Sequence, residues 1–233
     1  MADAYIVEAV RTPTGRKGGG LAHVHPADLG AFVLRALLER AQVDPEHVDD
    51  VIFGCVDQVG AQSLNLARQA WLTAGLPESV PGTTLDRQCG SSQQAAHFAA
   101  QGVMSGTYDL VVAGGVENMT MVPIGASAFV GMQAGLGSPF EAQGWVARYG
   151  EQEISQFRGA ELIAEEWGLT RDELEAYALE SHRRASAAWE EGRFDREVVA
   201  YNGVTRDEGF RPDASLEKMA ALPLLPGARV HTA

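Results

Sequence analysis

The chain has 233 residues, of which 45% are hydrophobic and 21% are charged, as is typical of a globular protein with an apolar core. Its formal net charge of −13 argues against nucleic acid as a general partner, because binding to phosphates requires a basic surface. No apolar run is long enough to span a membrane, and no basic, signal-like segment opens the chain. We therefore expect a soluble, cytoplasmic protein that binds neither nucleic acid nor membrane.

The first 120 residues alternate between strand-like and helix-like segments. A short β-rich run over 4–10 precedes a segment over 25–43 that shows helical apolar spacing. Further strands are expected over 49–60, 80–84 and 109–115, and further helices over 63–77, with Ser63 as a candidate N-cap, and over 91–106. The run "DLVVAGG" is apolar without alternation, as expected for a strand covered on both faces. This order predicts an α/β domain with a largely parallel sheet.

The composition and periodicity of the sequence change at about residue 121. Residues 121–144 are rich in Gly, Ala, Met and Ser without a clean period, and they predict a long loop excursion, which in a compact domain is usually functional. Helices are expected over 159–168 and 170–192, followed by a strand over 196–204 and a short helix near the end.

The two cysteines, Cys55 and Cys89, differ in their surroundings. Two cysteines without CxxC spacing predict neither a disulfide framework nor a zinc site. Cys55 lies within the apolar run "VIFGCV" and is expected to be buried. Cys89 lies in "TLDRQCGSSQQAA", between a predicted strand and a predicted helix, where the helix N-terminus favours the thiolate. Small residues follow it and leave room for an acyl group, and its own amide is placed to donate to an oxyanion.

Two interpretations of Cys89 remain open from composition: a packed small hydrophobe or a nucleophile. Its small and polar neighbours favour the nucleophile, which requires an acid or base nearby. His97 lies eight residues along the same predicted helix, which is about 12 Å along the axis at about 1.5 Å per residue and too far for a hydrogen bond. The chain therefore offers a nucleophile without an evident acid-base partner.

The chain resembles the thiolases, the acetyl-CoA acyltransferase family, in six segments that occur in the family's order: "EAVRTPTGRKGG", "VIFGCVDQVG", "NLARQAWLTAGLP", "VPGTTLDRQCGSSQQA", "DLVVAGGVENMTMVP" and "AELIAEEWGLTRDELEAYALESHRRA". The resemblance spans essentially the whole chain. It implies a thiolase-like layered α/β fold, of which residues 1–120 form an incomplete first half with a mixed, largely parallel sheet and helices. Residues 121–233 would form the inserted loop domain with helices, cut near its end.

The resemblance also implies that Cys89 is the nucleophile that forms an acyl-thioester, with its backbone N–H in the oxyanion hole. In the family this cysteine attacks the 3-keto carbonyl of a 3-oxoacyl-CoA, acetyl-CoA leaves, and a second CoA takes the acyl group. The reverse reaction is a Claisen condensation of two acyl-CoA molecules. Coenzyme A is then a substrate in fatty acid metabolism, no permanently bound cofactor or metal is implied, and the full-length form is expected to be a homodimer or tetramer.

The family's activating histidine, acid-base cysteine and water-holding asparagine lie in Gly-His-Pro, Cys-x-Gly-Gly-Gly and Asn-Glu-Ala segments, and none of these occurs in this sequence. The closing "VHTA" resembles the start of a longer family stretch. We therefore expect residues 1–233 to be inactive alone and the sheet to have an unpaired edge. The missing C-terminal half would be part of a longer chain or be supplied by a separate one.

Two departures from the family concern substrate binding. Gln156 and Phe157 stand where many members have Met-Gly, and Pro223 stands where the family usually carries a basic residue that helps to hold CoA. The candidate contacts to the CoA phosphates are Arg183, Arg184, Arg211 and Lys218. Solvated surface charge is the alternative interpretation of each.

Two other functions compete with the thiolase interpretation. A ketoacyl synthase relative would share the fold and the cysteine at a helix, but "VENMTMVP" and "ARQAWLTAGLP" favour a thiolase. A non-catalytic thiolase-fold protein, which handles lipids or binds a partner, is the alternative from a different class.

Overall fold

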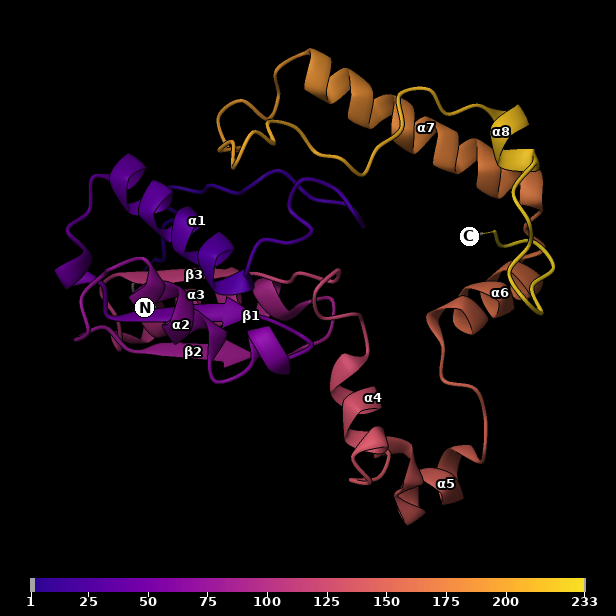
Figure 1. Ribbon diagram of the computed structural model, residues 1–233, viewed down its shortest axis with the longest axis horizontal. Helices are drawn as coiled ribbons and strands as arrows, with labels where there is room; N and C mark the ends of the chain where they lie inside the picture. The colour runs from indigo at the N-terminus through magenta and orange to yellow at the C-terminus, as the bar shows by residue number, and fades with distance from the viewer. Residues whose placement is uncertain (1–2, 233) are drawn as a thin grey trace. The chain divides into compact units, whose positions relative to one another are not determined.

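The computed structural model describes residues 3–232 (Figure 1). These residues form the strands β1 (Asp50–Gly54), β2 (Gly82–Leu85) and β3 (Val111–Gly115). The α-helices are α1 (Pro26–Ala41), α2 (Leu66–Thr73), α3 (Ser91–Ser105), α4 (Ala126–Gln133), α5 (Gln143–Tyr149), α6 (Gln156–Trp167), α7 (Arg171–Glu190) and α8 (Leu216–Ala220). Short 3-10 helices are η1 (Pro45–His47), η2 (Gly60–Gln62) and η3 (Pro139–Glu141). No helix among the described residues is long and apolar enough to cross a membrane.

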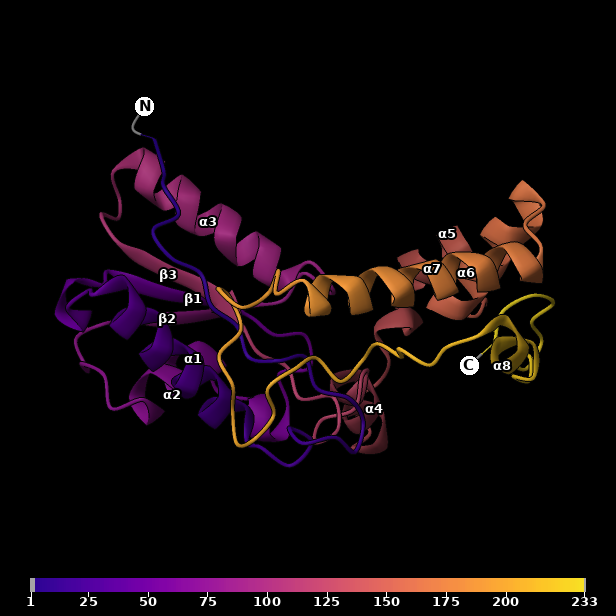
Figure 2. The same ribbon diagram turned by 90° about the horizontal axis from the view of Figure 1, so that it is seen from above.

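The three strands form one parallel sheet in the order β2-β1-β3. Val51 of the central strand lies opposite Gly82 on one side and Val112 on the other. Helices α1 and α2 lie on one face of the sheet and α3 lies on the other (Figure 2). The parallel pairing and the helices on both faces confirm the α/β fold that the alternating segments predict.

The core lies between the sheet and the helices α1 and α2. Leu34 of α1, Val51 of β1 and Trp71 of α2 are each at most 1% exposed. The Trp71 Nε1 donates a hydrogen bond of 2.8 Å to the Pro77 carbonyl oxygen, so the indole is buried with its polar atom satisfied. This packing fixes the position of β1, the central strand of the sheet.

Helix ends follow local capping chemistry. In α7 the Thr170 side chain accepts from the Glu173 amide and the Glu173 carboxylate accepts from the Thr170 amide, which is a complete capping box. At α2 the sequence expectation is wrong, because the N-cap is Asn65, whose side chain accepts from the Arg68 amide. Ser63 instead ends the preceding 3-10 turn. The N-cap of α2 therefore lies two residues later than predicted.

Residues 4–10 do not form the strand that their composition predicts. They pair with no described strand, and Tyr5, Ile6 and Val7 are 81%, 90% and 65% exposed. The chain is fixed at the next residue, where the Arg11 amide donates to the Glu197 carbonyl and the Arg11 guanidinium pairs with Glu197 and Asp207 at 2.7 Å each. A segment becomes a strand only when its backbone hydrogen-bonds to a neighbouring strand, and residues 4–10 make no such bonds to a described strand.

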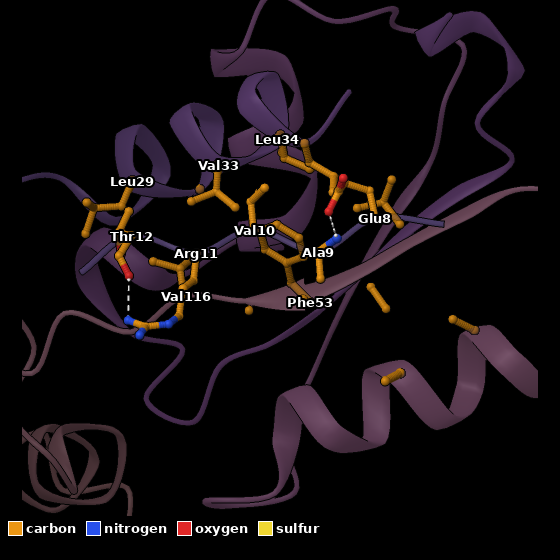
Figure 3. Close-up of a pocket in the computed structure, with 18 of the residues that line it drawn as sticks. Glu8, Ala9, Val10, Arg11, Thr12, Leu29, Val33, Leu34, Phe53 and Val116 are labelled. Atoms are coloured by element: carbon orange, nitrogen blue, oxygen red, sulfur yellow. Dashed lines mark hydrogen bonds between the residues drawn. The ribbon is translucent and has the colours of Figure 1, made fainter. Parts of the chain in front are cut away.

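A cavity of about 1400 Å³ lies between residues 3–12 and the open edge of β3. Its lining includes Val10 and Thr12 of the N-terminal segment and Leu29, Val33 and Leu34 of α1, which Figure 3 labels. The α3 side chains Ala96, His97, Ala99, Ala100 and Val103 also line it. Residues from the helices on both faces of the sheet therefore line the cavity. A further strand placed beside β3 would be lined in the same way.

The chain forms two compact units. Unit 1 contains Met1–Gly137 and Arg196–Glu208, and unit 2 contains Ser138–Asp195 and Gly209–Ala233. The sequence places a division at residue 120, whereas the compact units divide after Gly137. One cause is Asp57, whose carboxylate accepts from the amides of Gly125 and Ser127 at 2.9 Å each and so joins the start of α4 to the loop after β1.

Two further segments differ from the expectation. The span over 121–144, which lacks a clean period, contains α4, η3 and the start of α5. Helix α4 is apolar around much of its circumference, with Phe129 60% and Met132 52% exposed. Its sequence therefore lacks the amphipathic pattern that predicts a helix. Residues 196–204 form no strand and contribute only isolated bridges, from Val198 to Arg11 and from Tyr201 to Val204.

Candidate active site

Cys89 lies at the carboxyl end of the sheet, in the turn between β2 and α3. Its thiol is exposed. The amides of Gly90 and Ser91 are occupied by turn hydrogen bonds of 3.1 and 3.0 Å to the carbonyls of Arg87 and Gln88. The Cys89 amide, by contrast, has no acceptor among the described residues, so it is available to an oxygen that approaches the thiol.

The turn that carries Cys89 has an uncommon backbone conformation. Gln88 has a φ of 50°, in the left-handed region that residues other than glycine rarely adopt. The Asp86 carboxylate accepts from the Gln88 amide at 2.6 Å, and the Arg87 guanidinium donates to the Gln94 side chain. Local hydrogen bonds on both sides thus hold the turn in a conformation that the backbone alone would not favour.

Cys55 lies in a different environment, just after β1. It is 1% exposed, and its burial, followed by the negative charges of Glu117 and Asp57, raises the pKa of its thiol to about 12. Cys55 is therefore a neutral, inaccessible thiol near neutral pH, as its apolar context predicts.

Two polar side chains that the sequence motifs do not single out, the partly buried Glu117 and the buried Asn118, support the loops at this end of the sheet. The Glu117 carboxylate accepts from the amides of Val56 and Asp57 at 2.8 and 3.0 Å. The Asn118 side-chain amide donates to carbonyl oxygens of the loop before α1, namely those of Leu21, Ala22 and Val24. The signal was present in the sequence, because polar residues directly after buried parallel strands mark the edge at which loops gather.

No described histidine completes a catalytic pair with Cys89. His97 is exposed on α3 and lines the cavity beside β3, and the Cys89 thiol has no hydrogen-bond partner among residues 3–232. No group of three or more potential metal ligands is found in the same residues. What unit 1 brings together is therefore an accessible thiol, an available amide and a helix start.

The six candidate substrate contacts all lie in unit 2. Gln156 and Phe157 begin α6, and Phe157 is 67% exposed. Arg183 and Arg184 both pair with Glu180, at 2.6 and 2.7 Å, and these ion pairs lower the pKa of Glu180 to about 2. Both arginines are thus already engaged on the surface of α7.

The remaining two cations differ from each other. The Lys218 ammonium pairs with Asp213 at 2.5 Å. The Arg211 side chain has no ion pair among the described residues, and its amide donates to His182 Nδ1 at 3.2 Å. Arg211, His182 and Arg183 line a cavity of about 440 Å³ between α7 and the segment 211–214. Arg211 is therefore the candidate whose charge is most available to an anionic group.

Comparison with known proteins identifies relatives along the whole chain. Residues 4–226 match the family model described as thiolase, N-terminal domain. The chain is 56% identical, over an alignment 239 residues long including gaps, to the steroid 3-ketoacyl-CoA thiolase FadA6 of Mycobacterium tuberculosis, and the alignment covers 100% of this chain and 58% of that protein. It is 38% identical over 235 residues to a 3-ketoacyl-CoA thiolase of Idiomarina loihiensis, with 95% and 57% covered.

A solved structure agrees with these matches. The crystal structure of the acetyl-CoA acetyltransferase of Bacillus anthracis superposes with a TM-score of 0.77 at 32% identity, covering 97% of this chain and 59% of that one. The fold is therefore the one that the sequence resemblance implies. The chain spans less than three fifths of the length of these relatives.

Proposed function

The chain belongs to the thiolase family, and on that premise we propose that the protein containing it is an acyl-CoA acyltransferase that uses Cys89 as its nucleophile. The observation that carries this proposal is the exposed Cys89 thiol beside its own available amide at the start of α3. The thiolate attacks the 3-keto carbon of a 3-oxoacyl-CoA, and the amide donates to the resulting oxyanion. The bond between C2 and C3 then breaks, and acetyl-CoA leaves as its enolate and takes a proton.

The second half of the reaction regenerates the thiol. The thiol of a second CoA attacks the Cys89 thioester, passes its proton to a base and accepts the acyl group, and Cys89 is released. Coenzyme A is a substrate in this scheme, and the described residues need no bound cofactor for it. The names of the relatives support 3-oxoacyl-CoA thioesters as the substrate class, with steroid-derived acyl chains to be tested beside straight ones.

The test is detection of the acyl-enzyme by mass spectrometry after mixing the full-length protein with acetoacetyl-CoA or longer 3-oxoacyl-CoA thioesters. The acyl group is expected on Cys89, and Cys89→Ala is expected to abolish both the adduct and the turnover. Cys55→Ala is the matched control, and it is expected to retain the adduct because Cys55 is buried. An acyl group on another residue, or CoA binding without any adduct, contradicts the proposal and favours a non-catalytic thiolase-fold protein.

We propose further that residues 1–233 need more polypeptide to act. In β3 the Leu110 carbonyl and the Val116 amide bond to the β1 side, so the backbone groups of Val111, Ala113 and Gly115 point to the open edge. The adjoining cavity of about 1400 Å³ exceeds the usual range of roughly 300–1,000 Å³ for small-molecule pockets. Its apolar lining from both faces suits a buried strand of the C-terminal half.

Co-expression tests this second proposal. Residues 1–233 are expected to show no turnover alone, and to gain CoA-dependent thiolysis when the C-terminal region follows on the same chain or is supplied as a separate one. Replacing Ala113 by Pro is expected to weaken assembly, because proline removes an edge N–H, whereas Ala96→Ser on α3 is the conservative control. Turnover by residues 1–233 alone would contradict the requirement.

Binding of CoA through unit 2 is the third part of the proposal. Because its side chain has no ion pair with any residue in the described range 3–232, Arg211 is expected to contribute more to CoA binding than Arg184, which pairs with Glu180. Arg211→Ala should raise the KM for CoA several-fold with little change in kcat, and Arg184→Ala should leave both near the wild-type values. Equal effects would remove Arg211 from the CoA site. We expect the full-length protein to be a cytoplasmic homodimer or tetramer. Analytical ultracentrifugation of the full-length protein measures its oligomeric state.

A further inference from the structure

The first turn of α3, which follows Cys89 directly, lies against two glycines of the sheet. Gly54 ends β1 and Gly115 ends β3, and the two residues are partners in the β1–β3 register. Helix α3 covers the face of the sheet on which this pair lies (Figure 2). The pair therefore forms a platform without side chains at the point where the helix begins, which we call the glycine platform (Gly54 and Gly115).

The spacing at the glycine platform leaves no room for a methyl group. A Cβ on Gly54 would lie 2.3 Å from the Ser92 nitrogen and 2.4 Å from the Ser91 carbonyl carbon, both of which are backbone atoms. A Cβ on Gly115 would lie 2.1 Å from the Ser92 Oγ and 2.5 Å from the Gly54 carbonyl oxygen. Because backbone atoms of the helix cannot rotate away, a side chain at Gly54 requires the start of α3 to move.

The neighbouring glycine on the same strand shows that this tightness is local. A Cβ on Gly114 would meet only the Phe53 ring, at 3.4 Å or more, which is ordinary van der Waals contact. Alanine at Gly114 is therefore accommodated by small adjustments, and its backbone φ does not require glycine. Gly114 and Gly115 both lie in β3, but a Cβ at each would touch different atoms.

Ser91 fixes the same turn from within. It is 4% exposed, and its hydroxyl donates to the Gln88 carbonyl at 2.6 Å while accepting from the Arg87 amide at 2.9 Å. These two bonds span Cys89 and hold Gln88 at its positive φ. The hydroxyl of the next residue, Ser92, has no hydrogen-bond partner among the described residues.

We propose that Gly54, Gly115 and Ser91 are positioning residues for Cys89: the glycine platform sets the depth of the α3 N-terminus, and the Ser91 hydroxyl sets the orientation of the turn. This inference rests on the proposed function, because it concerns how the nucleophile is aimed. The thiol and the Cys89 amide belong to one short turn, so a displacement of the helix start moves both together. A misplacement of about 1 Å is enough to lower the rate of a reaction on the order of 100-fold.

The first test compares Gly54→Ala with Gly114→Ala in the full-length protein. Gly54→Ala is expected to lower kcat on the order of 100-fold while leaving the KM for the acyl-CoA unchanged, because no substrate-binding residue is altered. Gly114→Ala is expected to retain kcat within about twofold, which corresponds to a fraction of a kcal/mol. Equal kcat values for the two variants, at equal melting temperatures, would overturn the proposal.

The second test avoids a steric change and uses Ser91→Ala with Ser92→Ala as its matched control. Ser91→Ala is expected to lower kcat about tenfold and to speed hydrogen exchange at the amides of Arg87 and Gly90, since the Arg87 amide loses its acceptor and the turn loses both hydroxyl bonds. Ser92→Ala is expected to change neither. Unchanged exchange and unchanged kcat in Ser91→Ala would overturn the proposal even if Gly54→Ala failed to fold.

Failure of this inference can be told apart from failure of the proposed function. If wild-type protein forms no acyl-enzyme, the proposed function fails, but the hydrogen exchange of the Cys89 turn and the rate at which iodoacetamide modifies Cys89 still report its positioning. If wild-type protein turns over and the two pairs of variants do not separate, the function stands and the positioning role fails. Loss of exchange protection throughout α3 in Ser91→Ala would show general unfolding and would also count against it.

Discussion

The carboxyl end of the sheet in unit 1 and the surface of α7 in unit 2 hold their polar side chains in opposite ways. At the carboxyl end of the sheet, Asp57 and Asn118 are buried and bonded to backbone. On α7 they are exposed and paired with each other, as with Glu180 and its two arginines. Substitutions should therefore cost more stability at the sheet end than on α7, since a buried group that loses its partner is costly and an exposed pair contributes little.

The largest expected effect contrasts two tryptophans. Trp71 is fully buried in unit 1, whereas Trp167 is 69% exposed at the end of α6 in unit 2. Trp71→Ala is expected to lower the free energy of unfolding by about 3–5 kcal/mol, because it leaves a cavity and removes a hydrogen bond. Trp167→Ala is expected to change it by less than about 0.5 kcal/mol. Urea unfolding followed by circular dichroism measures both.

The second contrast replaces a carboxylate by an amide in each unit. Asp57→Asn places an NH2 group where a backbone N–H requires an acceptor, and we expect a loss of about 1–3 kcal/mol in the free energy of unfolding. Asp213→Asn removes only the exposed pair with Lys218, and its effect should be smaller. Hydrogen exchange over α4 should rise in Asp57→Asn alone, and an unaffected α4 would contradict the role of Asp57 in joining it to the sheet.

The third prediction concerns pH and the two cysteines of unit 1. The folded-state pKa of Cys55 is raised from 9.0 to about 12, so the folded protein holds this proton more tightly than the unfolded chain does. The resulting stability is fully present below pH 9, and it is lost as pH rises from about 9 to about 12. Thermal unfolding across this range should show a smaller decline in Cys55→Ala, and Cys89→Ala should keep the full decline.

Labelling with iodoacetamide adds a second measurement to that prediction. Near neutral pH the folded chain should react at Cys89 alone, and both thiols should react in denaturant, because Cys55 is buried. This selectivity follows from burial, so it does not by itself show that Cys89 is a nucleophile. Reaction of Cys55 in the folded chain would contradict the packed environment after β1.

The smallest expected effect is on the exposed surface of α7. Because the pKa of Glu180 is lowered to about 2, its ion pairs favour the folded state above the usual glutamate pKa and are lost as pH falls toward 2. The group is exposed and screened, so Glu180→Gln should shift the unfolding midpoint barely or not at all at neutral pH. A clear loss of stability that disappears in high salt would show that α7 depends on its surface charges.

The parts of the fold that follow from local periodicity were predictable. Helices α1, α3 and α7 and the strands β1 and β3 each lie within a segment that apolar spacing, an apolar run, or capping and turn residues predict. The parallel order of the sheet follows from the alternation of strands and helices. The exposed position of Cys89 and the burial of Cys55 also agree with their sequence contexts.

Other features were not predictable because they depend on residues far away in the chain. Residues 4–10 have the composition of a strand, but pairing depends on a neighbour that no local pattern reveals. The glycine platform is a contact between Gly54, Gly115 and a helix 37 residues after β1, so the sequence shows only glycines at the ends of strands. The acceptor roles of Asp57 and Glu117 likewise appear only once the loops are in place.

The pairing of Arg11 with Asp207 has a consequence for synthesis of the protein. The two residues are separated by 196 positions in the chain, and translation at about 5–20 residues per second takes roughly 10–40 s to cover that distance. During this interval the Arg11 guanidinium has none of its later carboxylate partners, so this part of unit 1 lacks the ion pairs that hold it in the folded structure. Unit 1 therefore completes its folding only after most of unit 2 has been made, which gives chaperones a defined period in which to act.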